Sequence, residues 1–221
     1  MRFVEDAFRV IRDHSEFLVA YSGGKDSLSI MDLVIQSKPH KVEAFFMYFV
    51  PGLACVEERL EWARKRWGIV IHQYPHWAFS KAVAYDVFRL PSPISKTFGE
   101  WGLLDVYAWA RKGSGIQTIV HGAKKSDSQW RRRSMAAGHN SDGVIYPIAE
   151  WSKFQVLAYL RGRNIPIPHS SAGNATGIDL TQPSLLWLYD NHPEDFRKVC
   201  EYFPFAEAEI WRRKFYGKET H

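Results

Sequence analysis

The chain has 221 residues, a net charge of +5 and 46% hydrophobic residues, enough to form the core of one large domain. Its two cysteines, Cys55 and Cys200, exclude a disulfide framework and a four-cysteine metal or iron–sulfur site. The first 17 residues are mixed and charged, unlike a signal peptide, and no apolar run approaches the roughly 18 residues of a membrane span. We therefore expect a cytoplasmic protein with an anionic partner and no membrane contact, and homo-oligomerisation stays open.

Strands and helices alternate along most of the chain. Apolar residues at helical spacing predict a helix over 4–11, and an uncharged apolar run predicts a buried strand over 17–21. Further strands are predicted over 42–50, 69–71 and 118–121. Helices are predicted over 27–35, over 56–67 ending at Gly68, over 101–111 ending at Gly113, and over 151–161 ending at Gly162.

Two further segments complete the predicted fold. Pro91-Ser92-Pro93 excludes a continuous helix over 76–99, and apolar residues over 184–215 predict a set of C-terminal helices. Strands that alternate with helices predict an α/β fold with a doubly wound parallel sheet and a helical C-terminal segment. We expect an α/β domain over 1–183 and a helical extension over 184–221 that packs on it.

The most informative segment is Ser22-Gly23-Gly24-Lys25-Asp26-Ser27, between the first predicted strand and the next helix. The two glycines let the backbone turn sharply and bring N–H groups close to an anion. The helix N-terminus adds unpaired N–H donors and a partial positive charge, and the serines and Lys25 add side-chain donors. The segment therefore predicts a cradle for phosphate or pyrophosphate.

These residues resemble the SGG-x-DS signature of the PP-loop ATP pyrophosphatases. The resemblance implies an adenine nucleotide alpha hydrolase-like fold that binds ATP, or a related nucleotide such as phosphoadenosine phosphosulfate (PAPS), with Mg²⁺. It implies that Asp26 either orients the loop or holds the Mg²⁺, and that Lys25 and Asp26 take part in catalysis. The implied nucleotide-binding residues of the loop are Ser22, Gly23, Gly24, Lys25, Asp26 and Ser27.

A second, basic segment, 121–133, follows the fourth predicted strand and holds five cations: Lys124, Lys125, Arg131, Arg132 and Arg133. Arginine and lysine at this density suit a polyanion, although solvated surface runs have the same composition. Ligands of doubly wound sheets bind beyond the carboxyl ends of the strands, where both segments are predicted to lie.

The basic segment resembles the PAPS reductase branch, whose pattern is approximately G-x-R-R-x-x-S-x-x-R. Gly122, Ser128 and Arg131 match that pattern, and Lys124 and Lys125 replace its two arginines. The resemblance spans roughly residues 15–170, with weaker similarity over 146–151 and 164–168. It implies that Lys124 and Ser128 bind the nucleotide and that Lys125 and Arg131 act in catalysis.

The reductases carry a nucleophilic cysteine in a C-terminal E-C-G-x-H motif, which this chain lacks. Cys200 lies in Lys198-Val199-Cys200-Glu201-Tyr202, typical of a small apolar residue inside a helix. Cys55 follows the second predicted strand, nearer the expected site, but no activating group is evident beside it. The scattered histidines lack the spacing of a zinc site: His72, His76, His121, His139, His169 and His192.

Three hypotheses follow. The first is an enzyme that cleaves ATP between the α and β phosphates, adenylates an acceptor and releases pyrophosphate. The acceptor would be a nucleobase in RNA or DNA, a carboxylate or another small molecule. The second is a PAPS or adenylylsulfate reductase, or a sulfotransferase-like enzyme, acting on a sulfonucleotide. The third is a nucleotide-binding module without turnover.

Overall fold

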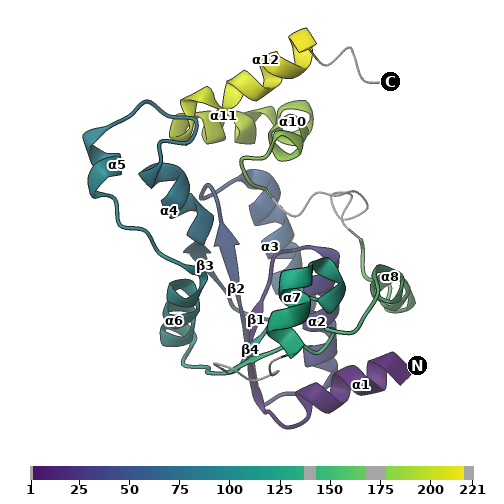
Figure 1. The fold of residues 1–221 in the computed structure, drawn as a ribbon. Helices are drawn as coiled ribbons and strands as arrows, with labels where there is room; N and C mark the ends of the chain where they lie inside the picture. Colours follow the sequence, from purple (N-terminus) through teal and green to yellow (C-terminus); the bar gives the residue numbers. More distant parts are fainter. Residues whose placement is uncertain (1, 137–142, 168–177, 217–221) are drawn as a thin grey trace.

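The computed structural model describes residues 2–136, 143–167 and 178–216 and contains a parallel five-stranded sheet in the order β3-β2-β1-β4-β5 (Figure 1). Every neighbouring pair of strands is parallel. The strands are β1 (Glu16–Ala20), β2 (Lys41–Tyr48), β3 (Ile71–Pro75), β4 (Ile119–Val120) and β5 (Val144–Ile145). The prediction of a doubly wound parallel sheet is confirmed.

The central strand β1 lies between β2 and β4. Phe17, Leu18 and Val19 of β1 are buried, as expected for a strand covered on both faces. From β1 the chain builds β2 and β3 on one side, then returns to the other side for β4 and β5. The order therefore reverses between β1 and β4, and ligands of such sheets bind beside that reversal.

Helices cover both faces of the sheet. Between residues 2 and 167 the described helices are α1 (Arg2–Ile11), α2 (Lys25–Gln36), α3 (Ala54–Trp67), α4 (Trp77–Ala84), α5 (Pro93–Thr97), α6 (Leu103–Ser114), α7 (Gln129–Ala136) and α8 (Lys153–Gly162). Phe17 and Val19 share a core with residues of α1, α2, α3 and α8, whereas Leu18 shares a core with residues of α6 on the opposite face (Figure 1). Among the helices that the structure describes, none has the length and apolar character of a membrane span.

Several predicted boundaries are wrong. The third strand runs over 71–75 rather than 69–71, because it is an edge strand and its polar residues conceal the strand pattern. The prediction missed β5, which has two residues. The helix predicted to end at Gly113 continues to Ser114, and Gly115 ends it in a left-handed conformation with φ of 76°. Pro93 begins α5, consistent with the break predicted there.

The C-terminal helices α10 (Gln182–Asn191), α11 (Pro193–Tyr202) and α12 (Glu207–Tyr216) lie beyond the carboxyl end of β2 (Figure 1). Leu185, Phe196 and Phe203 of this segment share a core with Val50 and Leu53, which follow β2. Phe203 is fully buried, and its ring lies 5.7 Å from Phe49 and 6.1 Å from Phe79. The division of the chain into 1–183 and 184–221 stays a prediction.

The shared core predicts that Phe203→Ala destabilises the whole chain. Loss of a fully buried ring costs about 3–5 kcal/mol of unfolding free energy. Urea unfolding followed by circular dichroism measures this loss. Phe205→Ala is the matched control, because the Phe205 ring is 45% exposed. Equal small effects of the two changes would contradict the proposed burial of the C-terminal helices.

Candidate functional site

The loop Ser22–Ser27 connects β1 to α2 in a conformation that depends on Gly23. Gly23 has a φ of 72°, a left-handed conformation that glycine adopts without strain. Gly24 occupies the N-cap position of α2 and supplies no side-chain cap to the first N–H groups of the helix. The Ser27 hydroxyl donates to the carbonyl oxygen of Gly24 at 2.9 Å, which fixes the turn. The first N–H groups of α2 thus receive no side-chain cap, as the predicted phosphate cradle requires, and the cradle itself stays a prediction.

Asp26 joins this loop to the basic segment. Its Oδ2 accepts from the Lys25 ammonium at 2.7 Å, and its Oδ1 accepts from the Lys124 ammonium, also at 2.7 Å. Lys124 also pairs with Asp127 at 3.0 Å, and Asp127 pairs with Arg131 at 2.9 Å. An unbroken chain of ion pairs therefore connects two motifs that are about a hundred residues apart in the sequence.

The backbones of the two motifs also touch. A Cβ atom placed on Gly122 would lie 3.1 Å from the carbonyl carbon of Asp26 and 3.3 Å from its Cβ. A side chain at position 122 would therefore require the segment after β4 or the start of α2 to shift by a few tenths of an ångström. The match of Gly122 to the PAPS reductase pattern therefore has a steric reason.

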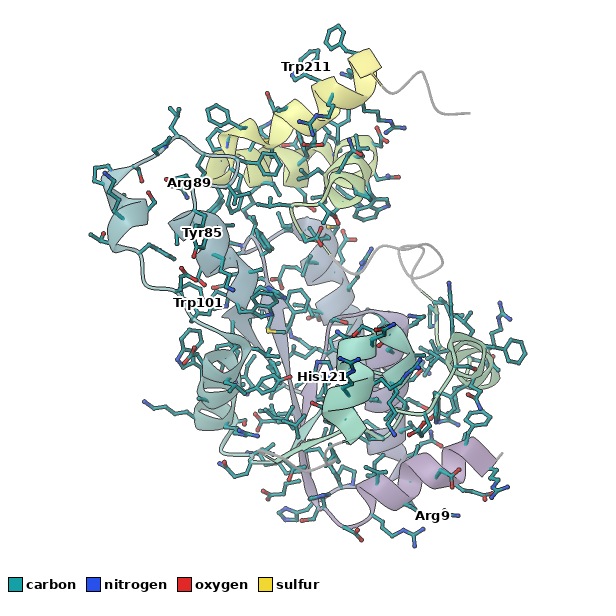
Figure 2. The ribbon with its side chains drawn as sticks, in the orientation of Figure 1. Arg9, Tyr85, Arg89, Trp101, His121 and Trp211 are labelled. Carbon is teal, nitrogen blue, oxygen red and sulfur yellow. The ribbon has the colours of Figure 1, made fainter. Side chains whose placement is uncertain are left out.

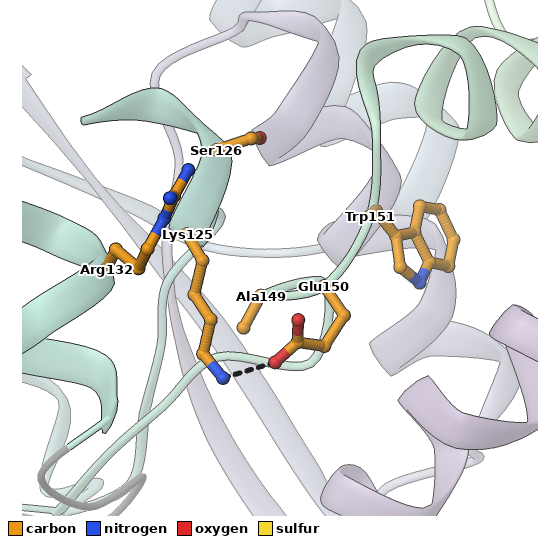
Figure 3. Close-up of a pocket in the computed structure, with 6 residues that line it drawn as sticks. All are labelled: Lys125, Ser126, Arg132, Ala149, Glu150 and Trp151. Atoms are coloured by element: carbon orange, nitrogen blue, oxygen red, sulfur yellow. Dashed lines mark hydrogen bonds and ion pairs between the residues drawn. The ribbon is translucent and has the colours of Figure 1, made fainter. Parts of the chain in front are cut away.

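The two neighbouring lysines have different environments. The sequence suggests that both are only partly buried, and this expectation is wrong for Lys124, whose side chain is 3% exposed between Asp26 and Asp127. Lys125 instead pairs with Glu150. Figure 3 shows this pair in a depression of about 280 Å³, also lined by Arg132 and Trp151 but by no residue of the loop Ser22–Ser27. Lys124 therefore contacts the loop through Asp26, and Lys125 lines a separate depression.

Ser128 and Asp127 organise the end of the basic segment. The exposed Ser128 hydroxyl accepts from the backbone N–H of Arg131 at 3.1 Å and so caps α7. Burial alone would raise the pKa of Asp127. Its pKa is nevertheless below the usual range, because the carboxylate accepts hydrogen bonds from the Lys124 N–H and ammonium and lies near the positive charges of Lys124 and Arg131. Asp127 is therefore ionised at neutral pH and holds both cations in place. The nucleotide-binding role of Ser128 stays a prediction.

His121 is a residue of this site that sequence reasoning did not single out. It directly follows β4, and its Nδ1 accepts from the N–H of Ala123 at 3.0 Å (Figure 2). Burial, together with the positive charge of Arg131, lowers its pKa to about 4. The imidazole is therefore neutral at pH 7 and carries its proton on Nε2. Its position at the carboxyl end of a strand was the signal available in the sequence.

Neither thiol is activated. Cys55 is buried, and burial together with the Asp195 carboxylate raises its pKa to about 12. Cys200 is half-buried in α11, as the sequence predicts for a helix, and burial together with Glu207 raises its pKa to about 11. Both thiols are protonated at neutral pH and so are poor nucleophiles.

A Mg²⁺ ion held by Asp26 does not fit this arrangement. Each carboxylate oxygen of Asp26 already accepts from a lysine ammonium at 2.7 Å. A divalent cation on the same carboxylate would be repelled by both ammonium groups. Of the two roles implied for Asp26, the geometry favours orientation of the loop.

The close contact at Gly122 predicts the effect of adding one methyl group. Gly122→Ala should lower the unfolding free energy by about 1–3 kcal/mol, the usual cost of overpacking. Gly162→Ala at the end of α8 is the control, because nothing lies within 4 Å of its added Cβ. Denaturant titration of both variants measures the difference. A Gly122→Ala variant as stable as the control would show that the two segments do not touch.

Comparisons with solved structures reveal the same fold in distant proteins. The U34-tRNA thiolase NcsA from Methanococcus maripaludis, solved with its [4Fe-4S] cluster, has a TM-score of 0.54 at 13% identity and covers 92% of this chain and 79% of its own. The NH₃-dependent NAD synthetase from Campylobacter jejuni, in complex with nitrate, has a TM-score of 0.53 at 12% identity, with coverages of 100% and 97%. A PAPS reductase from Candida auris, in a phosphate complex, has a TM-score of 0.48 at 17% identity, with coverages of 74% and 81%.

The similarities to the thiolase and to the NAD synthetase confirm the adenine nucleotide alpha hydrolase-like fold. No curated protein matches the chain by sequence. The family model of the phosphoadenosine phosphosulfate reductase domain matches residues 16–169, which include β1, the loop, the basic segment and α8. The predicted resemblance is confirmed, and the chain belongs to the phosphoadenosine phosphosulfate reductase domain family.

Proposed function

We propose that this protein binds ATP at the loop Ser22–Ser27, cleaves it between the α and β phosphates and transfers the adenylyl group to an acceptor. The observation that carries the proposal is the ion-paired Asp26. It fixes Lys25 and Lys124 beside the uncapped N-terminus of α2, at the reversal point of the sheet. Loop, helix end and lysines together provide donors for a polyphosphate.

The polyphosphate would lie against the first turn of α2. The backbone N–H groups there and the partial positive charge of the helix end stabilise the β and γ phosphates. Ser22 and Ser27 add hydroxyl groups 3.2 Å apart, both within the loop. Lys25 adds an ammonium group whose orientation is fixed by Asp26.

The charges of the site favour a polyanion. The positive groups are Lys25, Lys124 and Arg131, and the negative groups are Asp26 and Asp127. One net positive charge remains before any ligand binds. Because the ion pairs hold these groups in place, little reorganisation accompanies the reaction, which is the condition for electrostatic catalysis.

The proposed reaction needs no protein nucleophile. An acceptor oxygen attacks the α phosphorus, the bond from that phosphorus to the bridging oxygen breaks, and pyrophosphate leaves with the electron pair. A carboxylate acceptor loses no proton in this step, whereas a nucleobase that attacks through its carbonyl oxygen releases its ring N–H proton to solvent. Lys25 and Arg131 stabilise the charge that develops on pyrophosphate, and neutral His121 adds a hydrogen-bond donor without further charge.

Two arginines of α7 bear on the choice of acceptor. Arg132 and Arg133 are exposed on α7, adjacent to the site. Exposed arginines beside a catalytic site suit a phosphate backbone. We therefore favour a nucleobase in RNA or DNA as acceptor over a carboxylate or another small molecule.

Sulfonucleotide reduction is the second candidate, and the family match favours it. The usual route requires a cysteine that attacks the sulfate sulfur. Both thiols of this chain are protonated at neutral pH, and Cys200 lies in a regular helix without the E-C-G-x-H motif. Adenylation needs neither thiol, so it agrees better with the site.

Product analysis separates the candidates. The full chain is incubated with α-labelled ATP and RNA in one assay, and with PAPS and a thiol reductant in another. We expect AMP or an adenylylated acceptor with pyrophosphate in the first assay and no sulfite in the second. Sulfite with adenosine bisphosphate would establish the reductase, and nucleotide binding without product would establish a module without turnover.

Lys25→Ala tests the nucleotide site itself. Loss of a charged hydrogen bond should weaken ATP binding by about 1.5–3 kcal/mol, measured by calorimetry. Lys65→Ala removes the same charge from the exposed face of α3 and should leave affinity unchanged. If both variants bind ATP like the unmodified chain, Lys25 does not contact the polyphosphate.

A further inference from the structure

A group of three side chains of metal-binding types lies where the start of α3 meets the C-terminal helices. Ligand atoms of Cys55, His192 and Asp195 all lie within 4.8 Å of one another. Cys55 is in the first turn of α3, His192 joins α10 to α11, and Asp195 is in the first turn of α11. In the part of the chain that the structure describes, this is the one group of three such residues close enough to share a metal ion.

Asp195 is held in a fixed orientation. Its Oδ1 accepts from the N–H of Ala54 at 2.7 Å, and its Oδ2 accepts from the N–H of Cys55 at 2.9 Å. One turn later, the Lys198 ammonium donates to the carbonyl oxygen of Gly52 at 2.7 Å. These hydrogen bonds therefore hold the first turn of α3 against the first two turns of α11, next to Cys55. A carboxylate has about four lone-pair positions, so Asp195 retains acceptor capacity after these two bonds.

His192 is positioned from the other side. The backbone N–H of His192 donates to the Leu188 carbonyl at 2.7 Å, and the backbone carbonyl of His192 accepts from the N–H of Phe196 at 2.9 Å. Its ring lies 4.7 Å from the ring of Trp187. These backbone bonds and this ring contact therefore limit the orientations of the imidazole beside Cys55 and Asp195.

The chemistry of this trio suits zinc. Zinc takes sulfur, nitrogen and oxygen ligands at about 2.0–2.3 Å, which places tetrahedral ligand atoms roughly 3.3–3.6 Å apart. Two ligand atoms at the 4.8 Å limit would have to approach each other by roughly 1.2–1.5 Å to reach that spacing. A thiolate and a carboxylate together balance the two charges of the ion, so the buried cluster would be neutral.

We propose that Cys55, His192 and Asp195 bind one zinc ion that fastens the C-terminal helices to the start of α3. On binding, the Cys55 thiol releases its proton to solvent and a sulfur–zinc bond forms. A water molecule completes the tetrahedron, because the protein supplies three ligands and His192 is only half-buried. This site is separate from the phosphate loop and does not depend on the reaction proposed above.

The test uses the full chain, stripped with a chelator under reducing conditions and reloaded with Zn²⁺ or Co²⁺. We expect one metal ion per chain, and in the cobalt form an absorption band from thiolate-to-cobalt charge transfer. Because even indirect partners of metal ligands change affinity about 10- to 100-fold, Cys55→Ser should weaken zinc binding at least about 100-fold. It should also abolish the charge-transfer band.

Two further variants make the test specific. His192→Gln should weaken binding similarly but retain the charge-transfer band at high cobalt, because the thiolate remains. Cys200→Ser, which removes the other thiol, should change neither affinity nor spectrum. Asp195 is left intact because it caps α3 and its loss would disturb folding. A folded wild-type chain that takes up no stoichiometric metal, or a band that survives Cys55→Ser, would overturn the proposal.

Discussion

The ion pair between Lys124 and Asp26 is the interaction on which the site depends. Lys124 is almost fully buried, so its charge requires the two carboxylates that flank it. By meeting Asp26, it joins the segment after β4 to the loop after β1, two neighbouring strands of one sheet. Removal of Lys124 would take one cation from each of Asp26 and Asp127, and removal of Asp26 would leave Lys124 with Asp127, so either change would weaken the charge balance in the crevice where the sheet order reverses.

This arrangement divides the basic residues into two groups. Lys124 and Arg131 belong to the chain of ion pairs that begins at Lys25, and they shape the phosphate loop. Lys125 pairs with Glu150 in a separate depression that Arg132 also lines (Figure 3). A dense basic sequence can thus contain a structural cation and an accessible one side by side, because consecutive residues of a short turn point in different directions.

The sequence predicted the sheet, the loop and most helices because each depends on local patterns. The run Phe17–Tyr21 is apolar because β1 is buried on both faces, and Gly23 marks the turn that needs a left-handed residue. Other features escaped prediction because they depend on contacts between distant residues. The burial of Lys124, the low pKa of His121 and the approach of Asp195 to Cys55 all arise only when the chain folds.

The cap that Asp195 provides for α3 also has a consequence for the order of folding during synthesis. The bond from the Ala54 N–H to Asp195 closes a loop of 141 residues. The whole sheet leaves the ribosome before residue 195 does. The N–H groups of Ala54 and Cys55 in the first turn of α3 therefore lack their Asp195 partner until then. Nascent chains stalled before α11 should therefore be more easily cleaved by protease near Gly52–Cys55 than chains released in full. The last helices thus complete a helix that was made early in translation.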